Sequence, residues 1–162
     1  MKTNKKWIQK TDRVSEFYEN ETALAAINRK TLEATINFEV YKIRSSGIFS
    51  QKISLEDFNS KSVIEIKPEH WYSHSYSFQF NNETYKIIVR NNPLAEILIK
   101  KGNEECLAYG LDILNENKKI AVRINESNEK QPLEFHVLLW YLFEPVAREN
   151  TIDFQWWMWG IS

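Results

Sequence analysis

The sequence predicts a mainly β fold (α+β): an antiparallel β-barrel or curled sheet around a hydrophobic C-terminal helix, with a short helical segment at the N-terminus. Two observations lead to this fold class. Between residues 31 and 125, short runs alternate apolar and polar side chains and are separated by turns, with no repeated helical pattern between them. Residues 135–143 then form the most apolar stretch of the chain, flanked by prolines.

Residues 1–30 are expected to form a helical lead-in to the domain. Val14, Phe17 and Tyr18 have the i, i+3, i+4 spacing of one helix face. The segment NETALAAINRK that follows is read as a second short helix. A length of 162 residues suits one domain, so residues 31–162 are expected to form a single antiparallel β-barrel-like domain.

The first predicted strand is LEATINFEV, residues 32–40. Its period of two places five apolar side chains on one face. These side chains are Leu32, Ala34, Ile36, Phe38 and Val40. The alternation of apolar residues changes phase after Val40, which suggests a bulge. Two further strands are predicted at residues 48–55 and 63–67, and Pro68 ends the second of them.

Residues 76–80 and 85–89 form the clearest predicted hairpin, because apolar side chains alternate on both sides of the turn NNET. Similar units follow at residues 97–109 and 120–124. The total is about seven or eight strands before residue 125. We expect a sheet of this size to close or to form a sandwich, because its edges would otherwise expose unpaired backbone groups.

A buried helix is predicted at residues 132–144. Pro132 suits the first turn of a helix, and Pro145 is expected to stop or kink it. Apolar side chains would cover every side of this helix, so it must be surrounded, and a barrel can wrap it. A central β-strand is the alternative, since short apolar runs are ambiguous. The run is shorter than the ~20 apolar residues that span a membrane.

Composition limits the classes of partner and compartment. The net charge is −1, which predicts no nucleic-acid partner. Cys106 is the single cysteine and follows two glutamates, so we expect a buried or edge-strand thiol. The basic N-terminus has no apolar stretch after its lysines, which indicates a cytoplasmic protein. No phosphate-binding motif is present, and no cofactor is expected.

Three segments resemble the tubby C-terminal-like superfamily, which includes the tubby domain, the phospholipid scramblases and the LURP-one-related proteins. The segments are HWYSHSYSFQFNNETYKI, ILNENKKIAVRIN and FHVLLWYLFEPVA. The resemblance covers residues 31–150 and lies in the pattern of strands followed by one apolar helix. It implies a twelve-stranded barrel threaded by that helix, and an association with membranes, lipids or protein partners. The phosphoinositide-binding lysine–arginine pair and the scramblase calcium segment have no match here, so the resemblance assigns no site residue.

His70 and His74 are the candidate catalytic or metal-binding residues. On a helix their spacing of four would put both imidazoles on one face. They follow Pro68 and lead into a strand, where the two side chains lie too far apart to share an ion, so no metal site is expected. His136 and Glu144 bracket the apolar run, and we expect the histidine to be a satisfied structural group.

Aromatic residues are the candidate binding residues. The C-terminal segment FQWWMW concentrates side chains that suit a membrane–water boundary or a protein interface. The candidates are Phe154, Trp156, Trp157 and Trp159, together with Trp7 among the N-terminal lysines. The structural alternative is that the C-terminal segment is a last strand or tail that covers an open end of the fold.

Three functions are open at this point. The first is a non-enzymatic, tubby-like domain that binds a membrane surface, a lipid or a protein partner, and lies at the periphery of the membrane. The second is a lipocalin-like barrel that binds a small molecule in a hollow interior. The third is a hydrolase or isomerase that uses His70 or His74. A filled or a hollow interior separates the first two.

Overall fold

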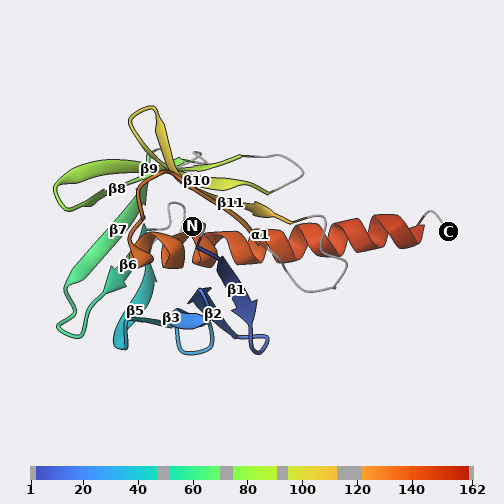
Figure 1. The fold of residues 1–162 in the computed structure, drawn as a ribbon, viewed down its shortest axis with the longest axis horizontal. Coiled ribbons are helices and arrows are strands. Elements are labelled where there is room, and N and C mark those ends of the chain that lie inside the picture. The colour runs from blue at the N-terminus through green and yellow to red at the C-terminus, as the bar shows by residue number, and fades with distance from the viewer. Residues whose placement is uncertain (1–2, 47–51, 70–74, 91–94, 113–121, 161–162) are drawn as a thin grey trace.

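The described part of the chain forms twelve β-strands followed by one helix, α1 (Leu133–Gly160) (Figure 1). The computed structural model describes residues 3–46, 52–69, 75–90, 95–112 and 122–160, with side chains as far as residue 148. The strands are β1 (Lys5–Gln9), β2 (Val14–Glu19), β3 (Thr22–Asn28), β4 (Glu33–Ile36), β5 (Glu39–Ser46), β6 (Lys52–Glu56), β7 (Ser62–Pro68), β8 (Ser75–Phe80), β9 (Glu83–Val89), β10 (Ile97–Lys101), β11 (Glu104–Leu111) and β12 (Val122–Glu126).

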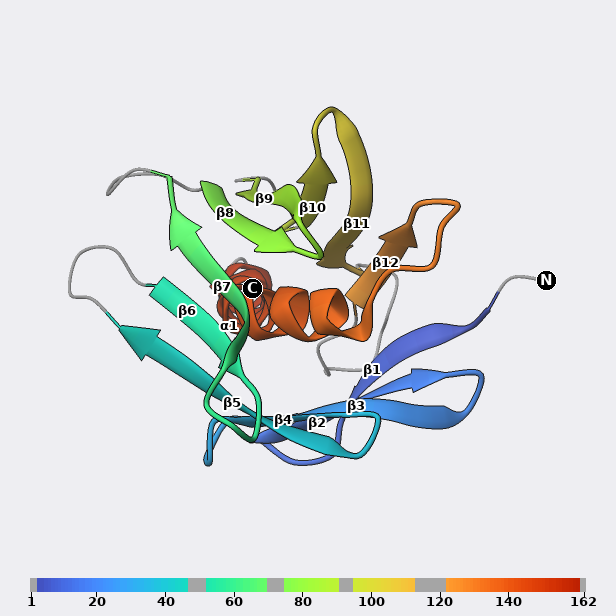
Figure 2. The same cartoon turned by 90° about the vertical axis from the view of Figure 1, so that its left-hand side faces the viewer.

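The strands curl into a nearly closed barrel around α1. Each strand pairs antiparallel with the next one along the chain, so β1 and β12 are the two edges of the sheet. These edges lie side by side where the barrel closes. Figure 2 looks along the helix and shows strands on every side of it. The predicted fold class, a mainly β antiparallel barrel around a hydrophobic C-terminal helix, is confirmed.

Two-residue turns join several of the strands. Both central residues have positive φ angles at Asn20–Glu21, Asn37–Phe38 and Asn81–Asn82. Positive φ at both positions is the geometry of type I′ turns, which match the twist of antiparallel strands and favour asparagine. These turns reverse the chain tightly, which explains why the strand order follows the chain order.

The prediction of a helical N-terminal segment is wrong, because residues 5–28 form β1, β2 and β3. Ser15 and Phe17 point into the barrel from β2, and Ala25 and Ile27 do so from β3. The spacing of the apolar residues was compatible with a helix, but pairing between strands satisfies the backbone and buries the alternating side chains. The barrel therefore begins at residue 5.

The strand predicted at residues 32–40 is a hairpin. β4 ends at Ile36, the chain reverses at Asn37–Phe38, and β5 follows. Ala34 and Ile36 are buried, whereas Phe38 is 95% exposed at the tip of the turn. The apolar alternation continues across the turn, so the pattern does not reveal the reversal. Nine strands, β4 to β12, thus occupy the region for which seven or eight were predicted.

The later strands agree with the alternation of the sequence. β8 and β9 form the hairpin predicted at residues 76–80 and 85–89. β7 matches the strand that Pro68 was expected to end, and β6 matches the second half of the strand predicted before it. Residues 47–51, where that predicted strand starts, lie outside the described residues.

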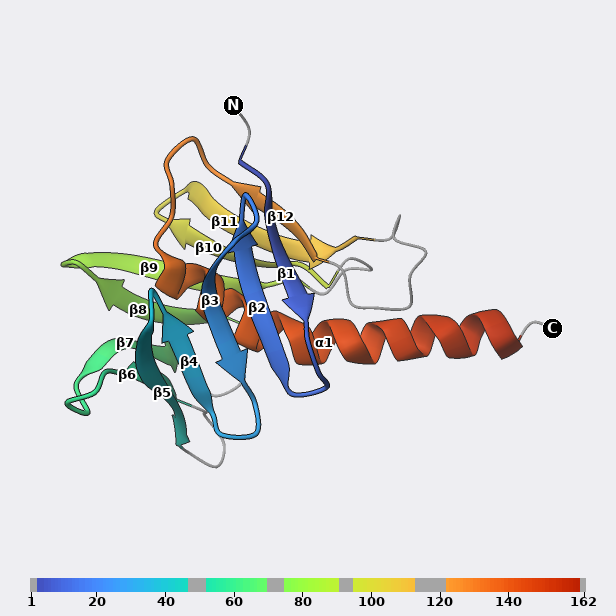
Figure 3. The same cartoon turned by 60° about the horizontal axis from the view of Figure 1, so that its bottom comes forward.

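Helix α1 fills the interior of the barrel with its first half. It begins at Leu133, directly after Pro132, as predicted, so the alternative of a central strand is wrong. Its buried apolar side chains are Phe135, Val137, Leu138, Leu139, Trp140, Phe143 and Ala147. Pro145 does not end the helix, which continues to Gly160, and the predicted end at residue 144 is wrong. Figure 3 shows the second half of α1 projecting beyond the barrel.

Candidate functional site

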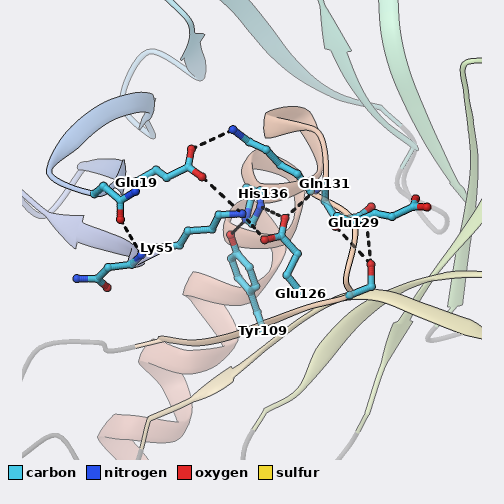
Figure 4. Close-up of polar contacts among 11 residues, drawn as sticks. Lys5, Glu19, Tyr109, Glu126, Glu129, Gln131 and His136 are labelled. Atoms are coloured by element: carbon cyan, nitrogen blue, oxygen red, sulfur yellow. Dashed lines mark hydrogen bonds and ion pairs between the residues drawn. The ribbon is translucent and has the colours of Figure 1, made fainter. Parts of the chain in front are cut away.

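A chain of polar side chains crosses the seam between β1 and β12 (Figure 4). Lys5 of β1 forms an ion pair with Glu126 of β12. The Glu126 carboxylate accepts a hydrogen bond from the backbone amide of Gln131 at 2.7 Å and lies 3.4 Å from Nε2 of His136 on α1. Nδ1 of His136 is 2.7 Å from the hydroxyl of Tyr109 on β11. Side chains thus join the two edge strands to each other and to the helix.

We call Lys5, Trp7, Tyr109, Glu126 and His136 the seam cluster. The groups that can only donate or only accept determine the direction of each hydrogen bond in it. The indole N–H of Trp7 donates to the Tyr109 hydroxyl oxygen at 2.8 Å, so the hydroxyl proton is available for Nδ1 of His136. The ionised Glu126 only accepts, so Nε2 of His136 carries the imidazole proton. A neutral His136 with its proton on Nε2 therefore satisfies both ring nitrogens.

The pKa shifts agree with a neutral His136. Burial lowers the pKa of His136 from its ordinary 6.5, and the neighbouring Glu126 offsets only part of this effect. Burial opposes the ionisation of Glu126, but hydrogen bonds from His136, Lys5 and Gln131 outweigh it and lower its pKa to about 2. Burial raises the pKa of Tyr109 well above its ordinary 10.0, so the phenol keeps its proton.

The seam cluster suits a structural bridge better than a catalytic site. A tyrosine, a histidine and a carboxylate joined by hydrogen bonds could act as a general acid–base relay. To be catalytic, such a relay must reach a reacting group of a substrate. Tyr109 and His136 are both buried. Phe17 stacks on the imidazole with ring centroids 4.6 Å apart. The imidazole is thus enclosed by the core.

A second group of residues, the exit cluster (Gln9, Arg29, Glu144 and Arg148), holds α1 where it leaves the barrel. The buried carboxylate of Glu144 pairs with Arg29, the residue after β3, at 2.7 Å and with Arg148 one turn further along α1. Gln9 of β1 donates a further hydrogen bond to Glu144 at 3.2 Å. Arg148 also donates to the backbone carbonyl of Asp12 at 3.3 Å. These contacts tie the helix to β1, to the residue after β3 and to the turn after β1.

Arg29 also compensates for Pro145 inside α1. Proline has no amide N–H, so the carbonyl of Tyr141, four residues earlier, lacks its helical partner. The guanidinium of Arg29 donates to that carbonyl at 2.7 Å and lies 4.9 Å from the centroid of the Tyr141 ring. The helix therefore continues through Pro145, because the side chain of Arg29, directly after β3, replaces the missing backbone donor.

Trp7 is a core residue and offers no exposed contact surface. It is 5% exposed and stacks on Trp140 of α1, with ring centroids 5.0 Å and planes 7° apart. The alternation of β1 turns Trp7 inward while Lys6 faces solvent. No strand was predicted there, so the neighbouring lysines suggested a surface position. The indole N–H of Trp140 has no hydrogen-bond partner among the described residues.

Cys106, His136 and Glu144 lie as the sequence predicts. Cys106 is buried on β11, and burial and the nearby Glu104 raise the pKa of its thiol. His136 and Glu144 are buried and hydrogen-bonded at two different places along α1. All three are therefore satisfied structural groups.

Several predicted site residues lie outside the part that the structure describes. His70 and His74 are among these, and the hydrolase or isomerase hypothesis stays a prediction. The C-terminal aromatic residues lie on the helical backbone of α1, not on a last strand, and their side chains are also outside the described part. They are Phe154, Trp156, Trp157 and Trp159. Among the described residues, three or more metal-ligating side chains do not come together.

Sequence reasoning placed Lys5 only among the basic residues around Trp7 and gave Arg29, Tyr109 and Glu126 no site role. Their partners are distant along the chain: Lys5 and Glu126 are 121 residues apart, and Arg29 and Tyr141 are 112 apart. One signal was present, since a histidine and a glutamate on an otherwise apolar helix each require a buried partner. That requirement predicts that partners exist but does not identify them.

The structure defines a twelve-stranded antiparallel barrel with a helix in its interior. Within the described residues, no helix combines the length and the hydropathy needed to cross a membrane. Comparison of the chain with protein-family models, with curated proteins and with solved structures gives no match. The resemblance to the tubby C-terminal-like superfamily therefore rests on the pattern of strands and helix alone.

Proposed function

We propose that the protein is a non-enzymatic, tubby-like barrel that attaches to a membrane surface through the second half of α1. The proposal rests on the path of this helix. The barrel encloses its first half, and its second half projects away from the barrel (Figure 3). Residues 149–160 provide about 18 Å of helix at ~1.5 Å per residue. This part holds three tryptophans, which suit the boundary between lipid and water. It is too short for the ~30 Å hydrocarbon core.

The filled interior favours a surface-binding scaffold over a small-molecule carrier. A lipocalin-like barrel keeps its interior for a ligand. Here Phe135, Trp140 and Phe143 occupy that space. The lipocalin-like function is therefore the second candidate, and it would require α1 to move out of the barrel.

The exit cluster supports the proposal because it fixes the base of the projecting helix. Arg29 joins the turn after β3 to both the Glu144 carboxylate and the Tyr141 carbonyl. Arg148 joins the helix to the turn after β1. A helix held at three points presents its distal half in a constant direction, which reduces the entropy lost on binding.

Vesicle co-sedimentation tests the proposal with the full-length chain. The matched proteins are the wild type, a variant with Trp156, Trp157 and Trp159 all changed to Ser, and Phe58→Ser as a control. Phe58 is exposed and belongs to the turn between β6 and β7, a turn that Figure 3 shows on the side opposite to the C-terminus. The wild type and the control should sediment with phosphatidylcholine vesicles and show a blue shift of tryptophan fluorescence, and the triple variant should do neither.

Two results would contradict the membrane proposal. Equal sedimentation of the triple variant, or none by the wild type, would remove the C-terminal tryptophans from the interaction. Binding that requires phosphatidylserine and disappears in high salt would instead indicate the N-terminal lysines. Melting curves of all three proteins should coincide, since none of the substitutions touches the described core.

A further inference from the structure

Two neighbouring hairpins expose phenylalanines at the end of the barrel where α1 begins. Phe38, between β4 and β5, is 95% exposed, and Phe58, between β6 and β7, is 94% exposed. Val40, the second residue of β5, is half exposed. Figure 3 shows both tips on the side opposite to the C-terminus. Phe38 is two residues from Val40 along the chain, and both turns lie at the same end of the molecule.

Phe38 is held there against its backbone preference. Its φ angle is 70°, in the left-handed region, at the second central position of a two-residue turn. Glycine is the favoured residue at that position, because a side chain is strained there. The equivalent position of the β8–β9 turn carries the polar Asn82, with φ of 62°. A bulky apolar residue that is both strained and exposed indicates a role outside folding.

A cleft of about 420 Å³ lies between the two hairpins. Its lining residues are Glu39, Val40, Tyr41, Asp57, Phe58 and Asn59. The Tyr41 hydroxyl donates to Glu39 at 3.1 Å, and the Asp57 carboxylate accepts from two backbone amides of its own turn. The cleft is therefore lined by hydrogen-bonded side chains of both hairpins.

The cleft carries negative charge that the described residues do not neutralise. Glu39 and Asp57 both line the cleft. Burial, the hydrogen bond to Glu39 and the charges of Glu39, Glu134 and Asp57 raise the pKa of Tyr41. In the described part of the chain, none of the three forms an ion pair with a basic side chain. An occupant with positive charge would supply the missing partner.

We propose that this cleft, with Phe38 and Phe58, docks a partner polypeptide segment that places arginine or lysine beside large apolar side chains. The phenylalanines would contact the apolar groups and the faces of the cations. Glu39, Asp57 and Glu134 would pair with the basic groups. The same carboxylates repel an anionic lipid surface, so a membrane is the less suitable occupant. The barrel would then bind a protein at one end and a membrane at the other.

Fluorescence anisotropy with defined peptides tests the docking site on the full-length chain. The probes are twelve-residue peptides that alternate leucine with arginine, leucine with glutamate, and serine with arginine. The leucine–arginine peptide should bind most tightly. Phe38→Gly and Phe58→Ser should each weaken its binding at least tenfold. Asn82→Gly, the matched turn substitution on another hairpin, should leave the affinity unchanged.

Charge variants test the acidic side of the cleft. Glu39→Gln together with Asp57→Asn keeps the hydrogen-bond acceptors but removes both charges. This double variant should weaken binding of the leucine–arginine peptide and reduce its salt dependence. Equal binding of the leucine–glutamate peptide, or equal affinity in Phe38→Gly and wild type, would overturn the proposal.

Two other outcomes would assign the surface to a different occupant and so also overturn the proposal. If Phe38→Gly abolishes vesicle binding, the hairpin tips contact lipid. If it abolishes self-association seen by analytical ultracentrifugation, the occupant is a second copy of the chain. The membrane proposal fails or succeeds separately, since it depends on tryptophans at the other end of the molecule.

Discussion

Arg29 donates a 2.7 Å hydrogen bond to the backbone carbonyl of Tyr141, the carbonyl that Pro145 leaves without a helical partner. The same guanidinium pairs with the buried carboxylate of Glu144. One side chain from the turn after β3 thus supports the helix at the point where its sequence would interrupt it. The projecting half of α1 depends on this support.

The Arg29–Tyr141 contact can be measured by a double-mutant cycle with Pro145. Arg29→Lys keeps a positive charge for Glu144 but loses the planar fork, and should cost about 1–3 kcal/mol of unfolding free energy. Pro145→Ala restores an amide that can bond the Tyr141 carbonyl. In that background the cost of Arg29→Lys should fall by about 1 kcal/mol in urea unfolding. Equal costs in both backgrounds would show that the carbonyl contact contributes nothing.

Tyr109→Phe should destabilise the protein by about 1–3 kcal/mol, because it leaves the Trp7 indole N–H without its buried acceptor. Tyr85→Phe is the matched control. The Tyr85 hydroxyl bonds to the exposed Glu83, and its loss should change stability by about 0.5 kcal/mol or less. Thermal unfolding of both variants checks the prediction. Similar losses in the two variants would contradict a special role for the seam cluster.

Acid should destabilise the protein in two steps. The pKa of His136 is lowered from 6.5 by folding, so the unfolded state binds the extra proton first and stability falls as the pH drops below about 6.5. The pKa of Glu126 falls from 4.5 to about 2 on folding, so its contribution is present above pH 4.5 and is lost toward pH 2. His136→Gln should remove the first step and leave a smaller second step when melting temperature is followed against pH, because Lys5 and Gln131 still bond to Glu126. A melting temperature that rises below pH 6.5 would refute this assignment.

Trp7→Ala should cost about 3–5 kcal/mol, because the indole is buried against Trp140 and bonded to Tyr109. Phe58→Ala removes an aromatic ring that is exposed, and should change stability by about 0.5 kcal/mol or less. Urea unfolding of the two variants separates a core aromatic from a surface one. A small loss for Trp7→Ala would return this residue to the candidate binding surface.

Phe38→Gly should stabilise the protein by about 0.5–1 kcal/mol, since glycine relieves the left-handed backbone at the turn between β4 and β5. Little packing is lost, because the ring is 95% exposed. The prediction is checked by the midpoint of urea unfolding, with Asn82→Gly as a control of smaller effect. A destabilised Phe38→Gly variant would show that the ring has contacts within the fold.

The sequence predicts the barrel and its helix because both depend on local periodicity. Alternating side chains between Ser75 and Val89 specify a hairpin with one buried face, and β8 and β9 follow them. The apolar run before Pro145 covers all sides of a helix, so burial on all sides follows. At the N-terminus, Phe17 and its neighbours fit a helix and a strand equally well. Only the neighbouring strands select one of the two.

The sequence by itself determined that an apolar helix would be enclosed by the strands that precede it, since exposing its surface to water is unfavourable. Only the tertiary structure decided which polar groups meet. Lys5 reaches Glu126 because barrel closure brings β1 beside β12, and Arg29 reaches Tyr141 because β3, which it follows, packs against α1. The energy of such contacts depends on distance and burial, and residue spacing along the chain specifies neither.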